Sequence, residues 1–232
     1  MNEPTSELLT PSQFEASEGV GAWAVISDGA CTFFPTASFA QAVALVSAIA
    51  ALPGVEDHQP HIDIRPDGVT VRLLTESAEW YGMSVRDVEL AGAISAAAAT
   101  LGLQGDRTQV QSLLIVPGAL DIGPVTPFWR AALGYEPRPD SPDEDIADPH
   151  ARGAAVWFET MDEPRTEVPA SGVGGGGAIH VAVWLPRELA KGRVEAALAA
   201  GGHLVRDVAP RWWTLADAAG NEVDIASVEG RD

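Results

Sequence analysis

Two histidines stand three residues apart in the stretch EDHQPHIDIR, which spans residues 56–65. Imidazole titrates near neutral pH, so His58 and His61 are candidates for moving protons or binding a metal ion. The same residues would also suit an ordinary polar connection whose histidines face solvent and have no task. Spacing alone does not decide between these two interpretations.

Two further runs could bind ligands, but their patterns indicate otherwise. The glycine-rich run SGVGGGGA at residues 171–178 precedes a strand-like pattern, whereas a phosphate-binding loop leads into a helix N-terminus. The acidic run DSPDEDIAD at residues 140–148 lacks the ligand spacing and central glycine of a calcium loop. We therefore expect a flexible loop at the first and a solvated acidic loop at the second.

The elements that would position the histidines can be predicted from their patterns. Apolar residues recur every three or four positions over residues 39–52, which predicts an amphipathic helix before the histidine stretch. Alternating apolar residues on both sides of the turn RPDG, residues 65–68, predict a hairpin with one apolar face. A second helix is predicted to begin at Ser84, because Asp87 follows it in the spacing of a capping box.

The run GLQGDRTQ at residues 102–109 is the best candidate for a domain boundary, because glycine and polar residues separate a helix pattern from a new strand. After it the predicted order is β-α-β followed by β-α-β-β, which is typical of a doubled small module. We therefore predict an α+β protein of two domains, residues 1–106 and 107–232.

Composition limits the classes of partner and the compartment. The chain carries 33 Asp and Glu against 14 Lys and Arg, a formal net charge of −19, so it repels phosphate backbones and anionic lipid. Its single cysteine allows no intramolecular disulfide and fits a reducing, cytoplasmic setting. The first residues lack the pattern of a signal peptide. We expect a small-molecule substrate, no nucleic acid and no membrane, and we leave a homo-oligomer open.

The segment from about Trp23 to Leu103 resembles the pterin-4a-carbinolamine dehydratase family. The family signature joins a His-His-Pro loop to a strand, then has a strand ending in Thr-His, then a helix start of the form Ser/Thr-x-Arg-Asp. The corresponding stretches here are HQP at 58–60, TE at 75–76 and SVRD at 84–87. The resemblance implies an α+β domain that binds a pterin.

This resemblance also implies roles for particular residues. The family uses three histidines to expel the 4a-hydroxyl and to manage the N5 proton, and His58 matches one of them. Gln59 occupies the second position, where it can hydrogen-bond but cannot titrate, and Glu76 occupies the third. His61 begins the following strand and is expected to face the same cleft. We therefore predict His58, His61 and Glu76 as catalytic, and as substrate-binding Gln59, Pro60 and Asp63.

The segment from about Val110 to Val228 resembles a glyoxalase-like domain of the vicinal oxygen chelate superfamily. The resemblance is carried by FWRAALGYE, AVWFE, IHVAVWLP, AALAAGGHLV and WWTLADAAGNEVDI. Each domain of that superfamily pairs two β-α-β-β-β modules into a half-barrel that often holds a divalent metal. Adjacent strand residues face opposite sides, so of the pair Trp212 and Trp213 one can line the cavity, and we predict Trp213 as substrate-binding.

By position, the superfamily resemblance implies Glu159, His180 and Asp224 as metal ligands. The first-strand ligand position falls at Leu113 or Leu114, where no ligand is present, and Gln111 is the nearest substitute. We therefore expect weak or no metal binding, and no other cofactor is implied. The alternative is that Glu159 and Asp224 are strand residues lining a pocket and that His180 is a satisfied inner histidine.

Together these patterns predict a 4a-hydroxytetrahydrobiopterin dehydratase, a hydro-lyase, fused to a small-molecule-binding domain. An eroded first site fits the same residues. The chain would then be an inactive dehydratase-like scaffold with a C-terminal binding or resistance domain, or with a metal-dependent lyase or dioxygenase there.

Overall fold

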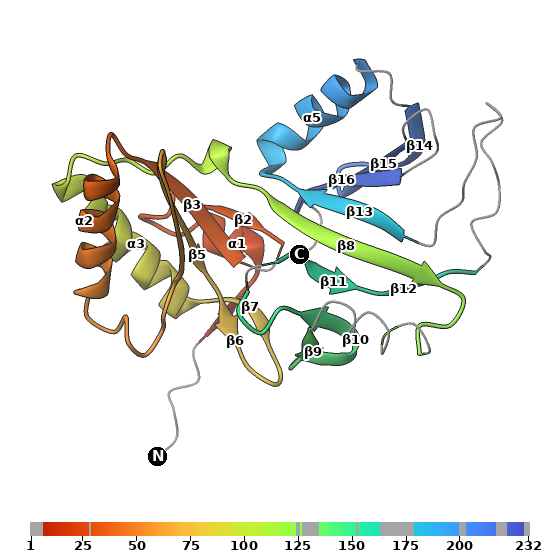
Figure 1. Cartoon of the computed structure of the whole chain (residues 1–232), viewed down its shortest axis with the longest axis horizontal. Coiled ribbons are helices and arrows are strands. Elements are labelled where there is room, and N and C mark those ends of the chain that lie inside the picture. The colour runs from red at the N-terminus through yellow and green to blue at the C-terminus, as the bar shows by residue number, and fades with distance from the viewer. Residues whose placement is uncertain are drawn as a thin grey trace. The chain divides into compact units, whose positions relative to one another are not determined.

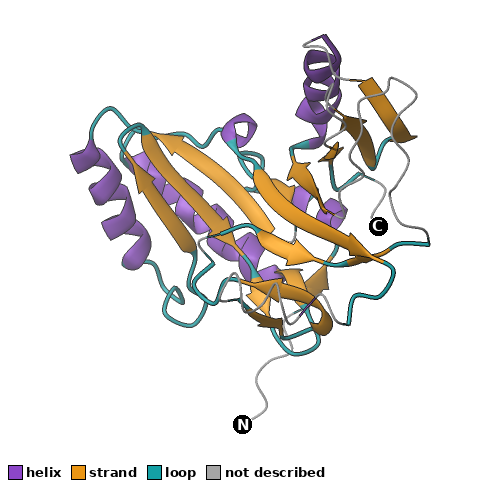
Figure 2. Ribbon diagram, turned by 45° about the vertical axis from the view of Figure 1, so that its right-hand side comes forward, coloured by secondary structure: helices purple, strands orange, loops and turns teal. Residues whose placement is uncertain are grey.

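The computed structural model describes residues 7–27, 29–123, 126, 135–151, 153–162, 179–199, 203–216 and 222–229 (Figure 1, Figure 2). The chain divides into two units, of which the first runs through Val110 and the second begins at Gln111. Helices and strands occur in both units, which confirms the predicted α+β class. The predicted boundary between residues 106 and 107 stays a prediction. Each unit is described by itself below.

The first unit is built on a four-stranded antiparallel sheet with the order β2–β3–β5–β4. A second, three-stranded sheet has the order β1–β7–β6. The predicted hairpin around RPDG is confirmed, since β4 and β5 pair with Arg65 opposite Gly68. The strands are β1 (Leu8–Leu9), β2 (Ala24–Ile26), β3 (Gly29–Pro35), β4 (His61–Arg65), β5 (Gly68–Leu73), β6 (Thr75–Glu76) and β7 (Tyr81–Ser84).

The helices of this unit begin at capping residues that the chain supplies locally. Helix α2 (Phe39–Ala50) begins after Ser38, whose side chain accepts a hydrogen bond from the Gln41 backbone N–H. Helix α3 (Val85–Thr100) begins with the predicted capping box between Ser84 and Asp87. The unit also contains α1 (Pro11–Glu15) and the 3₁₀ turn η1 (Arg107–Gln109).

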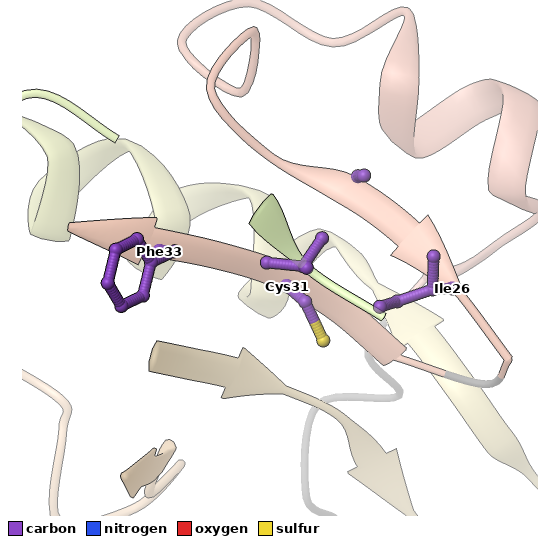
Figure 3. Packing of buried hydrophobic residues seen from close by; sticks show 5 residues of the cluster. Ile26, Cys31 and Phe33 are labelled. Atoms are coloured by element: carbon purple, nitrogen blue, oxygen red, sulfur yellow. The ribbon is translucent and has the colours of Figure 1, made fainter. Parts of the chain in front are cut away.

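The four-stranded sheet has two faces of different character. Val69, Val71 and Leu73 alternate along β5 and are buried, and α2 packs against β4 and β5. The opposite face, called the outer face here, carries the exposed β4 residues His61 and Asp63. Toward β2 and β3 the outer face becomes apolar, and Figure 3 shows the cluster there; its members are Ala24, Ile26, Cys31, Phe33 and Val110.

The second unit contains a nine-stranded mixed sheet with the order β14–β15–β16–β13–β8–β11–β10–β9, and β12 also pairs with β8. Helix α5 (Arg187–Ala199) packs against β15 and β16. The strands are β8 (Ser112–Ala119), β9 (Glu136–Arg138), β10 (Ser141–Ala147), β11 (Ala155–Trp157), β12 (Glu159–Thr160), β13 (Ile179–Trp184), β14 (His203–Val208), β15 (Trp212–Ala216) and β16 (Glu222–Ala226).

The expectation of an acidic loop at residues 140–148 is wrong for most of the run, because residues 141–147 form β10. Strand β10 pairs with β9 and β11, and Arg138 neutralises part of its charge. The Arg138 guanidinium donates to Asp140 at 2.7 Å and lies 2.8 Å from the carboxylate of Asp145. An ion pair from the neighbouring strand thus allows an acidic sequence to form a buried strand end.

Two other predictions fall outside the described residues: the glycine-rich run and most of the FWRAALGYE helix. None of the helices in the described part of the chain combines the length and the apolar character that a membrane span needs.

Candidate functional site

His58 is held against a buried carboxylate. Its Nε2 lies 2.6 Å from Oδ1 of Asp87, and the exposed fractions of the two side chains are 13% and 0%. His58 belongs to the turn that follows α2, whereas Asp87 lies in the first turn of α3. The Arg86 side chain of α3 also contacts this turn, because its Nη2 donates to the backbone carbonyl of Asp57 at 2.9 Å. The imidazole therefore has a defined partner and still reaches solvent.

The other carboxylate oxygen of Asp87 accepts several hydrogen bonds. Oδ2 receives the Ser84 backbone N–H at 2.7 Å, the Thr75 hydroxyl at 2.7 Å and the Ser84 hydroxyl at 3.0 Å. Thr75 lies in β6, and Ser84 both ends β7 and caps α3. A carboxylate held by donors at one oxygen keeps a fixed orientation, so its other oxygen stays directed at His58.

This arrangement determines what His58 can do chemically. A buried carboxylate accepts the Nε2 proton, which leaves Nδ1 of the neutral ring as a hydrogen-bond acceptor. The same carboxylate stabilises the imidazolium that forms when Nδ1 takes up a proton. His58 can therefore act as a base through Nδ1 and, once protonated, as an acid through the same atom.

Neither His61 nor Glu76 makes a hydrogen bond to Asp87 in the part of the chain that the structure describes. His61 begins β4 on the outer face, directly opposite Arg72 of β5. The pKa of His61 lies below its usual value because of partial burial of the ring and then the positive charge of Arg72, while the Glu76 carboxylate acts in the opposite direction. The lowered pKa favours the neutral ring, which can accept a proton.

The predicted substrate-binding residues of the first domain lie near these histidines in the chain. Gln59 is exposed, and its amide donates to Glu56 over 3.4 Å, while Pro60 is half-buried. Asp63 shares the outer face with His61 and accepts a hydrogen bond from Arg65 at 2.8 Å. Their predicted roles in binding stay predictions.

Sequence reasoning missed two members of the hydrogen-bonded group, Asp87 and Thr75. Asp87 was expected only to cap a helix, and the structure shows that it both caps α3 and contacts His58. Both residues stand within stretches that carry the family resemblance, TE and SVRD. The acidic residue of the motif SVRD, which belongs to the same family signature as the His58 loop, was the signal that could have identified Asp87 as the partner of His58.

In the second domain the predicted metal ligands belong to three strands at three levels of the sheet. Asp224 of β16 pairs with Ala182, His180 of β13 with Val116, and Glu159 of β12 with Gly118. Glu159 and Asp224 are half-buried, and the side chain of His180 lies outside the described part of the chain. Within the ranges that the structure describes, no three His, Cys, Asp or Glu side chains are grouped as a metal site.

Of the two first-strand candidates on β8, Leu114 pairs with Ala182, which in turn pairs with Asp224, whereas Leu113 pairs with Val183 and lies on the opposite face. Trp213 packs against the apolar cluster beneath α5, which includes Leu185, Val194 and Leu215. The face that carries Asp224 instead carries Thr214 and Trp212, because these residues occupy paired or alternating positions on β15 and β16. The location of Trp213 thus gives it a packing role, while Trp212 is the tryptophan on the Asp224 face.

Comparisons with known families agree with both resemblances. The family model for pterin 4 alpha carbinolamine dehydratase matches residues 7–97. The model for the glyoxalase-like domain matches residues 114–226. A search of the curated proteins finds no match to the chain. The chain therefore joins an N-terminal pterin dehydratase-like domain to a C-terminal glyoxalase-like domain.

Proposed function

We propose that the N-terminal domain is a hydro-lyase that dehydrates 4a-hydroxytetrahydropterins, and that the C-terminal domain binds a small molecule. The observation that supports the first part is the contact of 2.6 Å between His58 Nε2 and the fully buried Asp87. This contact supplies an oriented imidazole at the position where the family resemblance requires a histidine. It also explains how one histidine could serve the reaction in a site where Gln59 and Glu76 replace the other two.

The reaction needs a proton at one atom and loses one at another. Protonated His58 donates to the 4a-hydroxyl, the C4a–O bond breaks, and water leaves as the N5 lone pair forms the C4a=N5 bond. His58, now neutral, takes the proton from N5, which yields the quinonoid dihydropterin and restores the imidazolium. No net proton is gained or lost by the protein, so a single acid–base group suffices.

The remaining predicted residues would assist this chemistry. Gln59 can hydrogen-bond the pterin but cannot exchange a proton with it. His61 begins β4 and Glu76 ends β6, and we propose that both contact the substrate beside His58. Because two family histidines are absent, we expect turnover to be slow. Restoring one of them by Gln59→His should raise the rate, and His61→Ala should cost less than the loss of His58.

The test is the rate of quinonoid dihydropterin formation by the full chain, compared with buffer. His58→Gln should lower this rate by about two to four orders of magnitude, because the amide cannot titrate. The Gln side chain can still donate to Asp87, so the melting temperature should stay close to that of the wild type. His58→Ala should lose as much activity and also some stability, because it leaves the buried Asp87 oxygen without its partner.

His150→Ala is the matched control, since His150 is an exposed histidine of the second unit. It should leave the rate unchanged. Wild-type turnover equal to that in buffer would contradict the enzyme and leave a dehydratase-like scaffold joined to a binding domain. A His58→Gln variant as fast as the wild type would contradict the role of this residue.

A further inference from the structure

Arg72 stands out among the positive charges of this acidic chain. With 33 acidic residues and 14 basic ones, partners for a cation are plentiful. The partly buried Arg107 and Arg138 pair with Glu15 and with aspartates. Arg72 is also partly buried, but its Nε has no hydrogen-bond partner, and it forms no ion pair with any residue that the structure describes. Such a donor is normally satisfied, so an external partner is indicated.

The position of Arg72 makes it reachable by a ligand. It lies on the outer face between Cys31 of β3 and His61 of β4, which are its paired neighbours. Cys31 is 6% exposed, whereas His61 is exposed, so Arg72 stands where the apolar part of this face meets its open part. A Cβ at Gly29 would lie 2.6 Å from Arg72 Nε. The glycine thus leaves the room that the arginine side chain occupies.

A short segment connects Arg72 to the candidate catalytic pair. Three residues after Arg72, the Thr75 hydroxyl donates to Asp87, which in turn contacts His58. Arg72 also lies directly opposite His61, which follows His58 by three residues. We infer that a molecule placed against His58 extends along the outer face toward Arg72.

We propose that Arg72 binds an oxyanion, a carboxylate or a phosphate, carried by the ligand of the N-terminal domain. The guanidinium group offers a planar fork of donors that matches both oxyanions. The inference rests on the proposed function for the identity of the ring that carries the anion. Glu76 does not compete for this role as a fixed partner, because no ion pair joins it to Arg72 among the described residues.

The experiment compares two pterins on the full chain by fluorescence titration at low salt. Pterin-6-carboxylate carries an anionic group, and 6-hydroxymethylpterin is its neutral counterpart. Wild type should bind the carboxylate about 10- to 100-fold more tightly, the range expected for charge-assisted hydrogen bonds. Arg72→Gln should abolish this preference and leave the affinity for the neutral pterin unchanged.

Arg65→Gln is the matched control, because Arg65 lies on the same face but is already paired with Asp63. It should keep the preference. If Arg72→Gln melts at a much lower temperature, Arg72→Met decides the matter, since it keeps an unbranched apolar stem and loses the charge. A reduced preference in that variant supports the proposal, and an unchanged one overturns it.

Equal affinity of wild type for the two pterins, or no binding of either, would overturn the inference. So would a preference that survives in Arg72→Gln. The outcome can be separated from the proposed function. A chain that discriminates between the pterins but dehydrates none contradicts the proposed activity alone, whereas an active chain without the preference contradicts the role of Arg72 alone.

Discussion

The two domains arrange their acidic residues and histidines in different ways. In the first, hydrogen bonds of 2.6 to 3.0 Å join His58, Thr75 and Ser84 to the single carboxylate of Asp87. In the second, the residues at the superfamily's ligand positions are spread over β12, β13 and β16. Residues of suitable type are thus present in both domains, and among the residues that the structure describes they form one connected group in the first.

Residues of suitable type form a candidate site when packing and hydrogen bonds fix their orientation. Asp87 is fully buried, and each of its oxygens has a defined partner, so the orientation of His58 follows from packing. The strand residues of the second domain share one sheet but stand at successive levels along it. Each of the three residues is two positions along its strand from the level of the next, and the side chain of His180 lies outside the described part of the chain, so the structure does not join them into one group.

The largest expected effect is that of Asp87→Asn, which removes the charged partner of His58. The amide keeps the shape of the carboxylate but removes the charge that orients His58 and stabilises its imidazolium. We expect the dehydration rate to fall by about two to four orders of magnitude. Asp87→Ala should in addition cost about 2–4 kcal/mol in the free energy of unfolding, because a helix cap and buried hydrogen bonds are lost.

Asp57→Asn is the control for this prediction. Asp57 is an exposed neighbour whose contact with Arg86 uses its backbone carbonyl, so the substitution leaves that contact intact. Activity and the urea midpoint should both match those of the wild type. An Asp87→Asn variant with full activity would show that the contact between His58 and Asp87 is purely structural.

A smaller effect concerns the pH dependence of stability through His61. Its folded pKa is lowered, so below the unfolded pKa of about 6.5 the unfolded chain binds more protons, and stability falls as the pH decreases. His61→Gln should remove this penalty and narrow the difference in melting temperature between pH 8 and pH 5. We expect a change of less than about 4 °C, since an exposed ring is well screened. If the difference in melting temperature between pH 8 and pH 5 were wider in the variant, the folded pKa of His61 would be raised and not lowered.

The smallest effect is expected for metal removal, which tests metal binding in the second domain. Protein purified without added metal should contain well under one equivalent of zinc, iron, nickel or manganese by elemental analysis. Incubation with EDTA should leave the melting temperature unchanged, and Glu159→Gln and Asp224→Asn should leave the metal content unchanged. One equivalent of any of these metals, lost in either variant, would show that the three strands do form a metal site.

Much of the first domain could be predicted from neighbouring residues. The caps at Ser38 and Ser84, the apolar period of α2 and the hairpin around RPDG all depend on residues within a few positions of one another. The two family resemblances, which the family models confirm, likewise rest on short ordered motifs. Local periodicity and capping chemistry are properties of a segment, so they can be read without knowing what the segment packs against.

Only the tertiary structure decided which distant groups meet. The partner of His58 lies 29 positions away, and Asp87 could equally have served as a cap alone. Most of the acidic run at 140–148 is a strand that pairs with β11, and Trp213 lies on the side of its sheet that faces the cluster beneath α5. In each case the residue's neighbours in the chain allow two outcomes. The choice depends on which surface packs against it, and packing brings together residues that the linear sequence separates.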